Sequence, residues 1–282
     1  MILSKNEFYS IIGYDVSEIE MILENIDLFY YEYSSAKKDK LGNKIYSNGK
    51  LKKRNFKPSK LQLKDVQNRI QHRVLNKIPL IDNIKGSVKG ISNIDNALCH
   101  RGKEFFFQTD LTKCFPSISS KMVFNSLRAK GFSKQVANLI TQLTTVKSDS
   151  DDIKKCLPQG APTSPTLANI VIEKADKRII SFLKERDITY TRWVDDLTFS
   201  SHKCFMGVLP NILSLIGQSG FKPSRKKTTY KHKRTLITGA VVYKNLKISQ
   251  TFRKLESRET NPNKIAGRNN YKELIYKANT KA

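Results

Sequence analysis

The sequence holds 282 residues, with 51 Lys and Arg against 25 Asp and Glu, so its formal net charge is +26. A chain of this length can bury the core of one large or two small domains without disulfides. So large a positive excess predicts a polyanionic partner, and nucleic acid is the leading class. No apolar run approaches the roughly 18 to 20 residues that a spanning helix needs, which excludes a membrane-spanning protein. Residues 1–26 lack the features of an export signal, so we expect a cytoplasmic protein.

Four cysteines, Cys99, Cys114, Cys156 and Cys204, lie far apart in the sequence and form no C-x-x-C pair. The four histidines make no ligand pattern around them, which argues against structural zinc and against a disulfide framework. We therefore expect buried, reduced thiols.

In the first quarter of the chain, apolar residues at helical spacing predict one or two short helices over residues 6–33. Residues 37–60 hold ten Lys and Arg and a single Asp, with turn signals at Gly42-Asn43 and Asn48-Gly49. This segment predicts a basic β-hairpin. Helical spacing returns over residues 61–78.

The middle of the chain begins with an apolar run over residues 104–111, which predicts a buried strand with Asp110 at its C-terminal end. A helix follows, for which either Ser119 or Ser120 is a suitable N-cap. A second helix is expected over about residues 134–146.

The next segment, residues 157–165, reads as a loop whose end starts a helix, with Ser164 as N-cap and Pro165 at the first helical position. Residues 190–200 place β-branched and aromatic residues on both sides of Asp195-Asp196. This is the pattern of a hairpin with the two acids at its turn.

Residues 236–242 predict one further strand, and the last forty residues are basic and moderately helical. No internal repeat or low-complexity tract is evident.

A sheet that places the strand ending in Asp110 beside the turn of Asp195-Asp196 brings three carboxylates together. Clustered like charges repel in a protein interior, and bound divalent cations offset that repulsion. Oxygen ligands with positions open for phosphate suit Mg²⁺. In a two-metal site, one ion activates an attacking hydroxyl and the other holds the leaving pyrophosphate. Asp110 and Asp195 are the bridging candidates, Asp196 would assist, and the backbone carbonyl of Leu111 completes the outer site.

Phe115 follows Asp110 closely, in a turn that leaves the predicted strand. A bulky ring there could lie beneath the sugar of an incoming nucleotide and exclude a 2′-hydroxyl. From position alone, packing in the core under the following helix is an equally good interpretation.

Four motifs, in this order, resemble those of reverse transcriptases: Asp110-Leu-Thr-Lys-Cys-Phe115, Leu157-Pro-Gln-Gly-Ala-Pro-Thr-Ser-Pro165, Trp193-Val-Asp-Asp196 and Ile237-Thr-Gly239. Within that superfamily the chain resembles the bacterial retron reverse transcriptases. Asn96-Ala-Leu-Cys-His100 is similar to their N-A-x-x-H element, and Ile237-Thr-Gly239 is similar to their V-T-G element. The likeness covers roughly residues 50–242.

The resemblance implies an α+β fold: a right-hand polymerase with fingers, a ferredoxin-like palm and a short helical thumb, copying RNA into DNA with Mg²⁺. The implied domains are residues 1–103 for the N-terminal helices and fingers and 104–242 for the palm, with an interleaved fingers segment at about 124–160. Residues 243–282 form a short basic thumb. Trp193 departs from the family, which usually has Tyr there.

The resemblance also implies roles for single residues. Asp110, Asp195 and Asp196 match the metal-binding acids, and Phe115 matches the sugar-sensing aromatic. The remaining matches are Gln159-Gly160 for the loop that contacts nucleotide and template, Arg54 with Lys53 for the grip of the fingers on the triphosphate, and Asn96, His100 and Thr238 for specific binding of a partner RNA.

Residues 222–234 hold seven Lys and Arg and no acid. Such a run is usually a solvated face, but the same excess recurs in other segments, and a polymerase holds a duplex by its phosphates. We therefore expect Lys226 and Lys227 to contact RNA or to lie near the leaving pyrophosphate.

Retron enzymes bind a structured non-coding RNA, prime DNA synthesis from one of its 2′-hydroxyls and leave a branched RNA–DNA product. They commonly serve phage defence beside an effector protein. The resemblance implies these partners, with dNTPs as substrates. Two alternatives stay open: another bacterial reverse transcriptase, of abortive-infection or group II intron type, without a retron RNA, and a non-catalytic RNA-binding protein on this scaffold.

Overall fold

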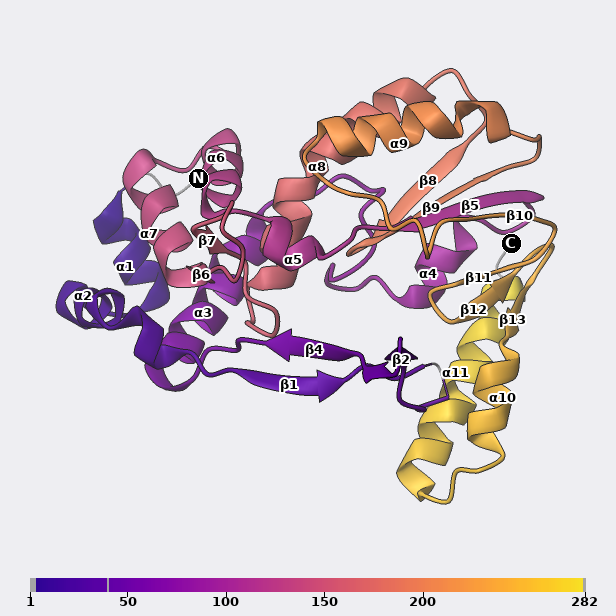
Figure 1. Ribbon diagram of the computed structural model, residues 1–282, viewed down its shortest axis with the longest axis horizontal. Helices are drawn as coiled ribbons and strands as arrows, with labels where there is room; N and C mark the ends of the chain where they lie inside the picture. The colour runs from indigo at the N-terminus through magenta and orange to yellow at the C-terminus, as the bar shows by residue number, and fades with distance from the viewer. Residues whose placement is uncertain (1–3, 40, 281–282) are drawn as a thin grey trace. The chain divides into compact units, whose positions relative to one another are not determined.

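The computed structural model describes residues 4–39 and 41–280 and divides into two compact units (Figure 1). Unit 1 comprises Met1–Lys37, Lys44–Ile81 and Lys113–Lys174. Unit 2 comprises Lys38–Asn43, Asp82–Thr112 and Ala175–Ala282. Both contain helices and antiparallel strands, which confirms the α+β class. Within the described residues, no helix combines the length and the apolar character needed to cross a membrane.

Helices form most of unit 1, and their first turns use short polar caps. Ser4, Ser119 and Ser133 each accept a hydrogen bond from a backbone N–H in the following turn. The helices expected within residues 6–33 and 61–78, and the two expected after the strand of Asp110, are confirmed. The elements are α1 (Lys5–Ile12), α2 (Val16–Glu24), the 3₁₀ turns η1 (Ile26–Phe29) and η2 (Leu75–Lys77), α3 (Leu61–Arg73), α5 (Cys114–Ser117), α6 (Ser120–Ala129), α7 (Lys134–Thr144) and the first part of α8 (Ser164–Leu183).

The predicted basic hairpin is present as a long antiparallel ribbon. Strand β1 (Tyr33–Ala36) pairs with β4 (Lys53–Phe56), and β2 (Tyr46–Ser47) pairs with β3 (Lys50–Leu51) farther along the ribbon. Asn48 and Gly49 join the last two strands with φ values of +49° and +72°. Both values lie in the left-handed region that this tight hairpin turn requires. A second small ribbon pairs β6 (Val146–Lys147) with β7 (Lys155–Cys156).

Unit 2 is built on a four-stranded antiparallel sheet with the strand order β10-β5-β9-β8. Its strands are β5 (Phe105–Asp110), β8 (Thr189–Trp193), β9 (Asp196–Ser201) and β10 (Thr229–His232). The C-terminal part of α8 and helix α9 (Leu209–Gln218) lie along one face of this sheet (Figure 1). The predicted strand at 104–111 and the predicted hairpin at 190–200 are both confirmed.

Successive side chains of β5 point to opposite faces of the sheet, and the two faces pack in different clusters of buried side chains. On the face toward α8, the rings of Phe107, Phe199 and Tyr190 pack against one another. Phe106 instead packs with α4 (Asn93–Leu98) and with a second sheet. The register of β5 against β9 is therefore strongly specified, because a shift by one residue would exchange the two clusters.

The second sheet corrects the prediction of a single strand over residues 236–242. It contains β11 (Thr235–Ile237), β12 (Ala240–Val242) and β13 (Leu246–Ile248). Thr238 and Gly239 form the turn between the first two, with φ values of +44° and +100°. Helices α10 (Gln250–Glu256) and α11 (Pro262–Thr280) complete the chain, which confirms the expected helical C-terminal segment.

Three further expectations are corrected. Ser164 is the first residue of α8, and its hydroxyl has no hydrogen-bond partner among the described residues, so it does not cap the helix. Helix α7 ends at Thr144, because residues 146–147 pair with β7. All four cysteines are free, but only Cys114 and Cys156 are buried, whereas Cys204 is exposed and Cys99 is partly buried.

Candidate active site

The register of the four-stranded sheet places three carboxylates at one edge of unit 2. Asp110 is the last residue of β5 and lies opposite Asp196, the first residue of β9. Asp195 precedes Asp196 in the two-residue turn that follows β8, and the Leu111 N–H donates to the Asp195 carbonyl over 2.9 Å. One oxygen from each carboxylate lies within 4.8 Å of the others. The expected convergence of the three acids is therefore present.

The environment of Asp110 fits a bound cation. The residue is 5% exposed, and its Oδ1 atom has no hydrogen-bond partner among the described residues. A buried carboxylate oxygen without a donor is energetically costly. A divalent ion held by Asp110, Asp195 and Asp196 would satisfy this oxygen, and oxygen-only ligands suit Mg²⁺.

Asp195 carries the electrostatic signature of this crowding. Burial, together with the neighbouring charges of Asp110 and Asp196, raises the pKa of Asp195 to about 6. The site therefore disfavours three negative charges when no cation offsets them.

Lys227 brings a cation to this cluster. Its ammonium group contacts Asp110 Oδ2. Burial alone lowers its pKa, but the bond to Asp110 and the charges of all three acids raise the pKa above the ordinary lysine value. The backbone fixes this approach, because the Ser224 N–H donates to the Asp110 carbonyl over 2.7 Å just before β10 begins. Lys226 is exposed on the same turn.

A buried ion pair supports the turn that carries Asp195. Arg192, on β8, is 0% exposed and bonds Asp176 of α8 through Nε at 2.9 Å and Nη2 at 2.7 Å. Tyr190 donates its hydroxyl to the same carboxylate over 2.6 Å. The Nη1 atom of Arg192 donates to the carbonyl of Val194, in the turn itself, over 2.7 Å. Sequence reasoning missed this pair; the only signal was an Arg within a strand of β-branched and aromatic residues.

Gly86 packs against the other side of the same turn. A Cβ at this position would lie 2.5 Å from the backbone nitrogen of Val194 and 2.8 Å from the carbonyl carbon of Trp193. No side chain fits there without moving the turn. Trp193, the residue that departs from the family pattern, is partly buried at this point.

His100 lies inside unit 2, away from solvent. Its two ring nitrogens each lie 2.7 Å from a hydroxyl, of Ser200 and of Thr191, on neighbouring strands. Burial, with a smaller effect of Lys103, lowers its pKa to about 3, so the ring is neutral. The side chain is 0% exposed and offers RNA no surface in this structure. A direct RNA contact by His100 stays a prediction.

Asn96 and Thr238 form a joint between α4 and the β11–β12 turn. The Asn96 amide lies 3.4 Å from the Thr238 hydroxyl, which donates to the Asn93 carbonyl over 2.9 Å. Asn93 in turn donates to the Thr238 carbonyl and to the Tyr271 hydroxyl of α11, both over 2.8 Å. The two elements that carried the retron resemblance thus contact each other. Asn96 is buried, so its expected RNA contact also stays a prediction.

The expected nucleotide-binding residues lie in unit 1, where two groups of them adjoin. Lys53 and Arg54 are exposed on β4. The end of that strand meets the loop of Gln159-Gly160. A Cβ on Gly160 would lie 3.5 Å from the ring of Phe56, the last residue of β4, and the N–H of Lys57, which follows the strand, donates to the Gln159 carbonyl over 2.9 Å. Phe115 is the second residue of α5 and is partly buried.

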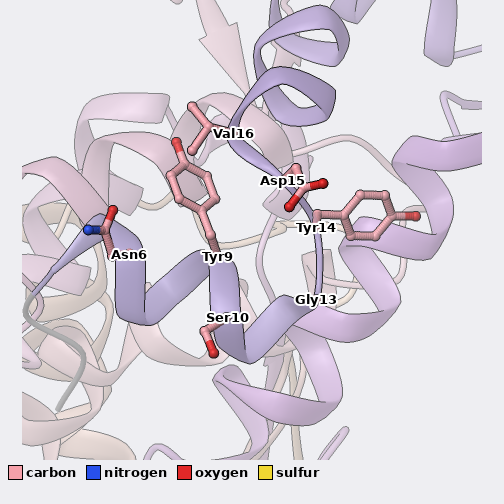
Figure 2. A pocket seen from close by; sticks show the side chains of 7 residues that line it. All are labelled: Asn6, Tyr9, Ser10, Gly13, Tyr14, Asp15 and Val16. Carbon is pink, nitrogen blue, oxygen red and sulfur yellow. The ribbon is translucent and has the colours of Figure 1, made fainter.

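A shallow pocket occurs elsewhere in unit 1, at the junction of α1 and α2 (Figure 2). It contains none of the residues singled out by sequence analysis. Its lining residues are Asn6, Tyr9, Ser10, Gly13, Tyr14, Asp15 and Val16.

Comparison with known proteins gives a consistent result. Residues 44–264 match the protein family described as "Reverse transcriptase (RNA-dependent DNA polymerase)". Three curated relatives are each 30% identical: the Retron Ec86 reverse transcriptase of Escherichia coli, over 233 residues, and the Retron Mx162 and Mx65 reverse transcriptases of Myxococcus xanthus, over 216 and 212 residues. These matches cover 80%, 67% and 69% of this chain. They span 67%, 44% and 49% of the relatives' own lengths.

Among solved structures, the chain is similar to the apo telomerase from Candida tropicalis, with a TM-score of 0.47 and 13% identity over 77% of this chain and 43% of that one. It is also similar to the telomerase from Candida albicans in complex with a fragment of telomeric RNA, with a TM-score of 0.44 and 14% identity. That match covers 56% of this chain and 33% of the telomerase chain.

Proposed function

Because the chain belongs to the reverse transcriptase family of RNA-directed DNA polymerases, we propose that it is the polymerase of a retron, copying part of a bound RNA into single-stranded DNA. The observation that carries this proposal is the convergence of Asp110, Asp195 and Asp196, with the unsatisfied Oδ1 of Asp110 among them. All three curated relatives described above are retron reverse transcriptases, which supports the retron assignment.

The three acids, with the carbonyl of Leu111, would hold two Mg²⁺ ions. When bound, these ions would supply Lewis-acid activation of an attacking hydroxyl and would neutralise charge on the leaving pyrophosphate. The protein's own contribution is to hold the ligands in place: β5 and β9 fix Asp110 and Asp196 opposite each other, and the Leu111 N–H holds the turn of Asp195. Lys227 places a positive charge at the same edge, where it would contact a phosphate once cations occupy the carboxylates.

For the nucleotide, we propose the residues of unit 1 that sequence analysis selected. Arg54 and Lys53 would bind the triphosphate, and Gln159-Gly160 would contact the base and template. Phe115 would pack beneath the sugar and exclude a 2′-hydroxyl. The contact between Lys57 and Gln159 supports this grouping, because it joins the basic strand to the loop.

The fold is that of a right-hand polymerase, as membership of this family implies. We propose fingers within residues 1–103, a palm over 104–242 with an interleaved fingers segment at about 124–160, and a thumb over 243–282. The two compact units group parts of these proposed regions differently, since unit 1 contains residues 113–174 and unit 2 contains residues 82–112.

The partner would be a structured non-coding RNA, contacted by the basic segment that includes Lys226 and coupled to the Thr238 turn. We propose priming from an RNA 2′-hydroxyl, a product that remains attached to the RNA, and a role in phage defence beside an effector protein in the bacterial cytoplasm. The similarity to retron reverse transcriptases supports these assignments.

The test is to express the chain with its native flanking locus and to sequence the nucleic acid that co-purifies, after RNase and DNase treatment. An RNA joined to a short, unique DNA is expected. The Asp195→Asn, Asp196→Asn double variant should yield RNA without DNA, because the metal ligands are lost while the RNA-binding surface remains. The matched control is Asp151→Asn with Asp152→Asn, an exposed adjacent pair in unit 1. Full DNA synthesis by the first double variant would refute the proposal, and heterogeneous nucleic acid would point to a differently primed enzyme.

The role of Phe115 has a separate test. Phe115→Ala should admit ribonucleotides in primer extension, while Phe115→Tyr should retain the preference for dNTPs. An unchanged dNTP/rNTP ratio in the Ala variant would leave Phe115 with a packing role only.

A further inference from the structure

The basic ribbon of unit 1 carries a row of three aromatic rings at its surface. The rings of Tyr31 and Tyr33 stack with their centroids 5.9 Å apart, and those of Tyr33 and Phe56 stack at 4.9 Å. Tyr31 is 48% exposed and Tyr33 is 47% exposed. Contiguous large rings left half in water are informative, because folding alone would bury them.

The row has a defined position on the ribbon. Tyr33 lies opposite Phe56, and Ser35 lies opposite Arg54. Side chains two apart on a strand share a face, so Arg54 lies on the same face as the aromatic row. Phe56, at one end of the row, lies against Gly160. Gly160 belongs to the loop that sequence analysis assigned to the nucleotide.

The charge around the row suits a polyanion. Residues 37–60 hold ten Lys and Arg and a single Asp. Lys57 is neutralised by ion pairs with Glu32 at 2.8 Å and Asp149 at 2.6 Å. Lys53 and Arg54, in contrast, are exposed and make no ion pair within the part of the chain that the structure describes. Their charges are available to phosphates.

Stabilisation of the ribbon explains only part of this arrangement. A two-stranded ribbon is marginal by itself, and the cross-strand pair of Tyr33 and Phe56 helps to hold it. Tyr31 lies outside both strands, yet its ring extends the stack. Stacked, half-exposed rings beside free cations are the combination by which proteins bind single-stranded nucleic acid, since every base offers a flat face.

We propose that Tyr31, Tyr33 and Phe56 form a stacking platform for unpaired RNA bases. While no nucleoside triphosphate occupies Arg54 and Lys53, these two cations are also available to the adjoining RNA phosphates. The ligand is single-stranded RNA rather than a duplex, because paired bases have no free faces to offer. That this strand is the template approaching the copying site rests on the proposed function. The binding of single-stranded RNA to the platform is independent of that function.

The experiment measures equilibrium binding of two labelled probes, an unstructured RNA strand of about twelve nucleotides and a blunt RNA duplex, without dNTPs or divalent ions. Tyr31→Ala is the main variant, because Tyr31 lies outside the strands and its loss leaves their pairing intact. Affinity for the single strand should fall about tenfold, which corresponds to one lost base stack. Duplex affinity and the slope of affinity against salt should not change, because no phosphate contact is removed.

Three further variants sharpen the result. Tyr33→Phe keeps the ring and should bind as the unaltered protein does. Arg54→Gln should weaken both probes and lower the salt slope by about one. Tyr46→Ala is the matched control, because Tyr46 is 59% exposed on the same ribbon and its ring stacks on no other ring among the residues that the structure describes. It should leave both affinities unchanged.

Unchanged single-strand affinity in Tyr31→Ala, or an equal loss for strand and duplex, would overturn the platform. The same measurements on the Asp195→Asn, Asp196→Asn double variant separate the two proposals. A tenfold effect of Tyr31→Ala in that background would uphold the platform even if the chain made no DNA, and DNA synthesis without this effect would overturn the platform alone.

Discussion

The buried ion pair of Asp176 and Arg192 is expected to make the stability of unit 2 sensitive to the loss of either partner alone. Both side chains are 0% exposed, and three Arg192–Asp176 contacts between 2.7 and 3.1 Å join them. Asp176→Asn keeps the shape of the side chain but removes its charge, leaving a buried guanidinium uncompensated. Breaking a buried pair in this way costs about 3 to 5 kcal/mol. Because Asn still accepts one hydrogen bond, we expect a loss of about 3 kcal/mol.

Urea unfolding followed by circular dichroism measures this loss. With a slope of about 3 kcal/mol per molar urea, the midpoint should fall by about 1 M. The control is Asp187→Asn, which breaks the pair of Asp187 with Lys103 at 3.1 Å, where the acid is 61% exposed. An exposed pair contributes at most about 1 kcal/mol. If Asp176→Asn lost no more than this control, the pair would not be the buried support inferred from its geometry.

A double variant separates stability from the support of the catalytic turn. Arg192→Met with Asp176→Leu replaces the pair by apolar side chains, which often restores stability. It also removes the Nη1 donor to the Val194 carbonyl. We expect recovered unfolding stability with DNA synthesis still reduced about tenfold or more, since small displacements of catalytic groups have large effects. Synthesis at the original rate would refute a positioning role for Arg192.

Three further outcomes are expected. Burial and the neighbouring acids raise the pKa of Asp195 to about 6. Because the folded state holds this proton more tightly than the unfolded state, the contribution of Asp195 to the free energy of unfolding falls as pH rises from about 4 to about 6. Without divalent ions, Asp195→Asn should therefore gain about 1 to 2 kcal/mol in urea titrations at pH 7 and little at pH 4; equal gains would contradict this. Lys227→Ala removes the cation that faces Asp110, so Mg²⁺ should raise its melting temperature more than that of the unaltered protein, and equal shifts would argue against competition. Gly86→Ala should displace the Trp193–Val194 backbone and abolish most DNA synthesis in primer extension. Normal synthesis would show that the turn can shift without loss of activity.

The local elements of this protein were predictable because their signals lie among neighbouring residues. Helical spacing, the Asn48-Gly49 turn and the serine cap at Ser119 each act within a few residues, and all are present as expected. The split of residues 236–242 into two strands was missed, because Thr238 adopts a positive φ that its residue type rarely takes.

The sequence alone also identified the three acids, since their motifs combine a strand end with a tight turn and together resemble one enzyme family. Only the tertiary structure decided what surrounds them. The β5–β9 register sets Asp110 opposite Asp196, Lys227 arrives from a segment far along the chain, and Asp176 is brought to Arg192 by the packing of α8 on the sheet. These contacts join residues that are distant in sequence, and burial selects them. No pattern among neighbouring residues specifies which partner a buried charge will find.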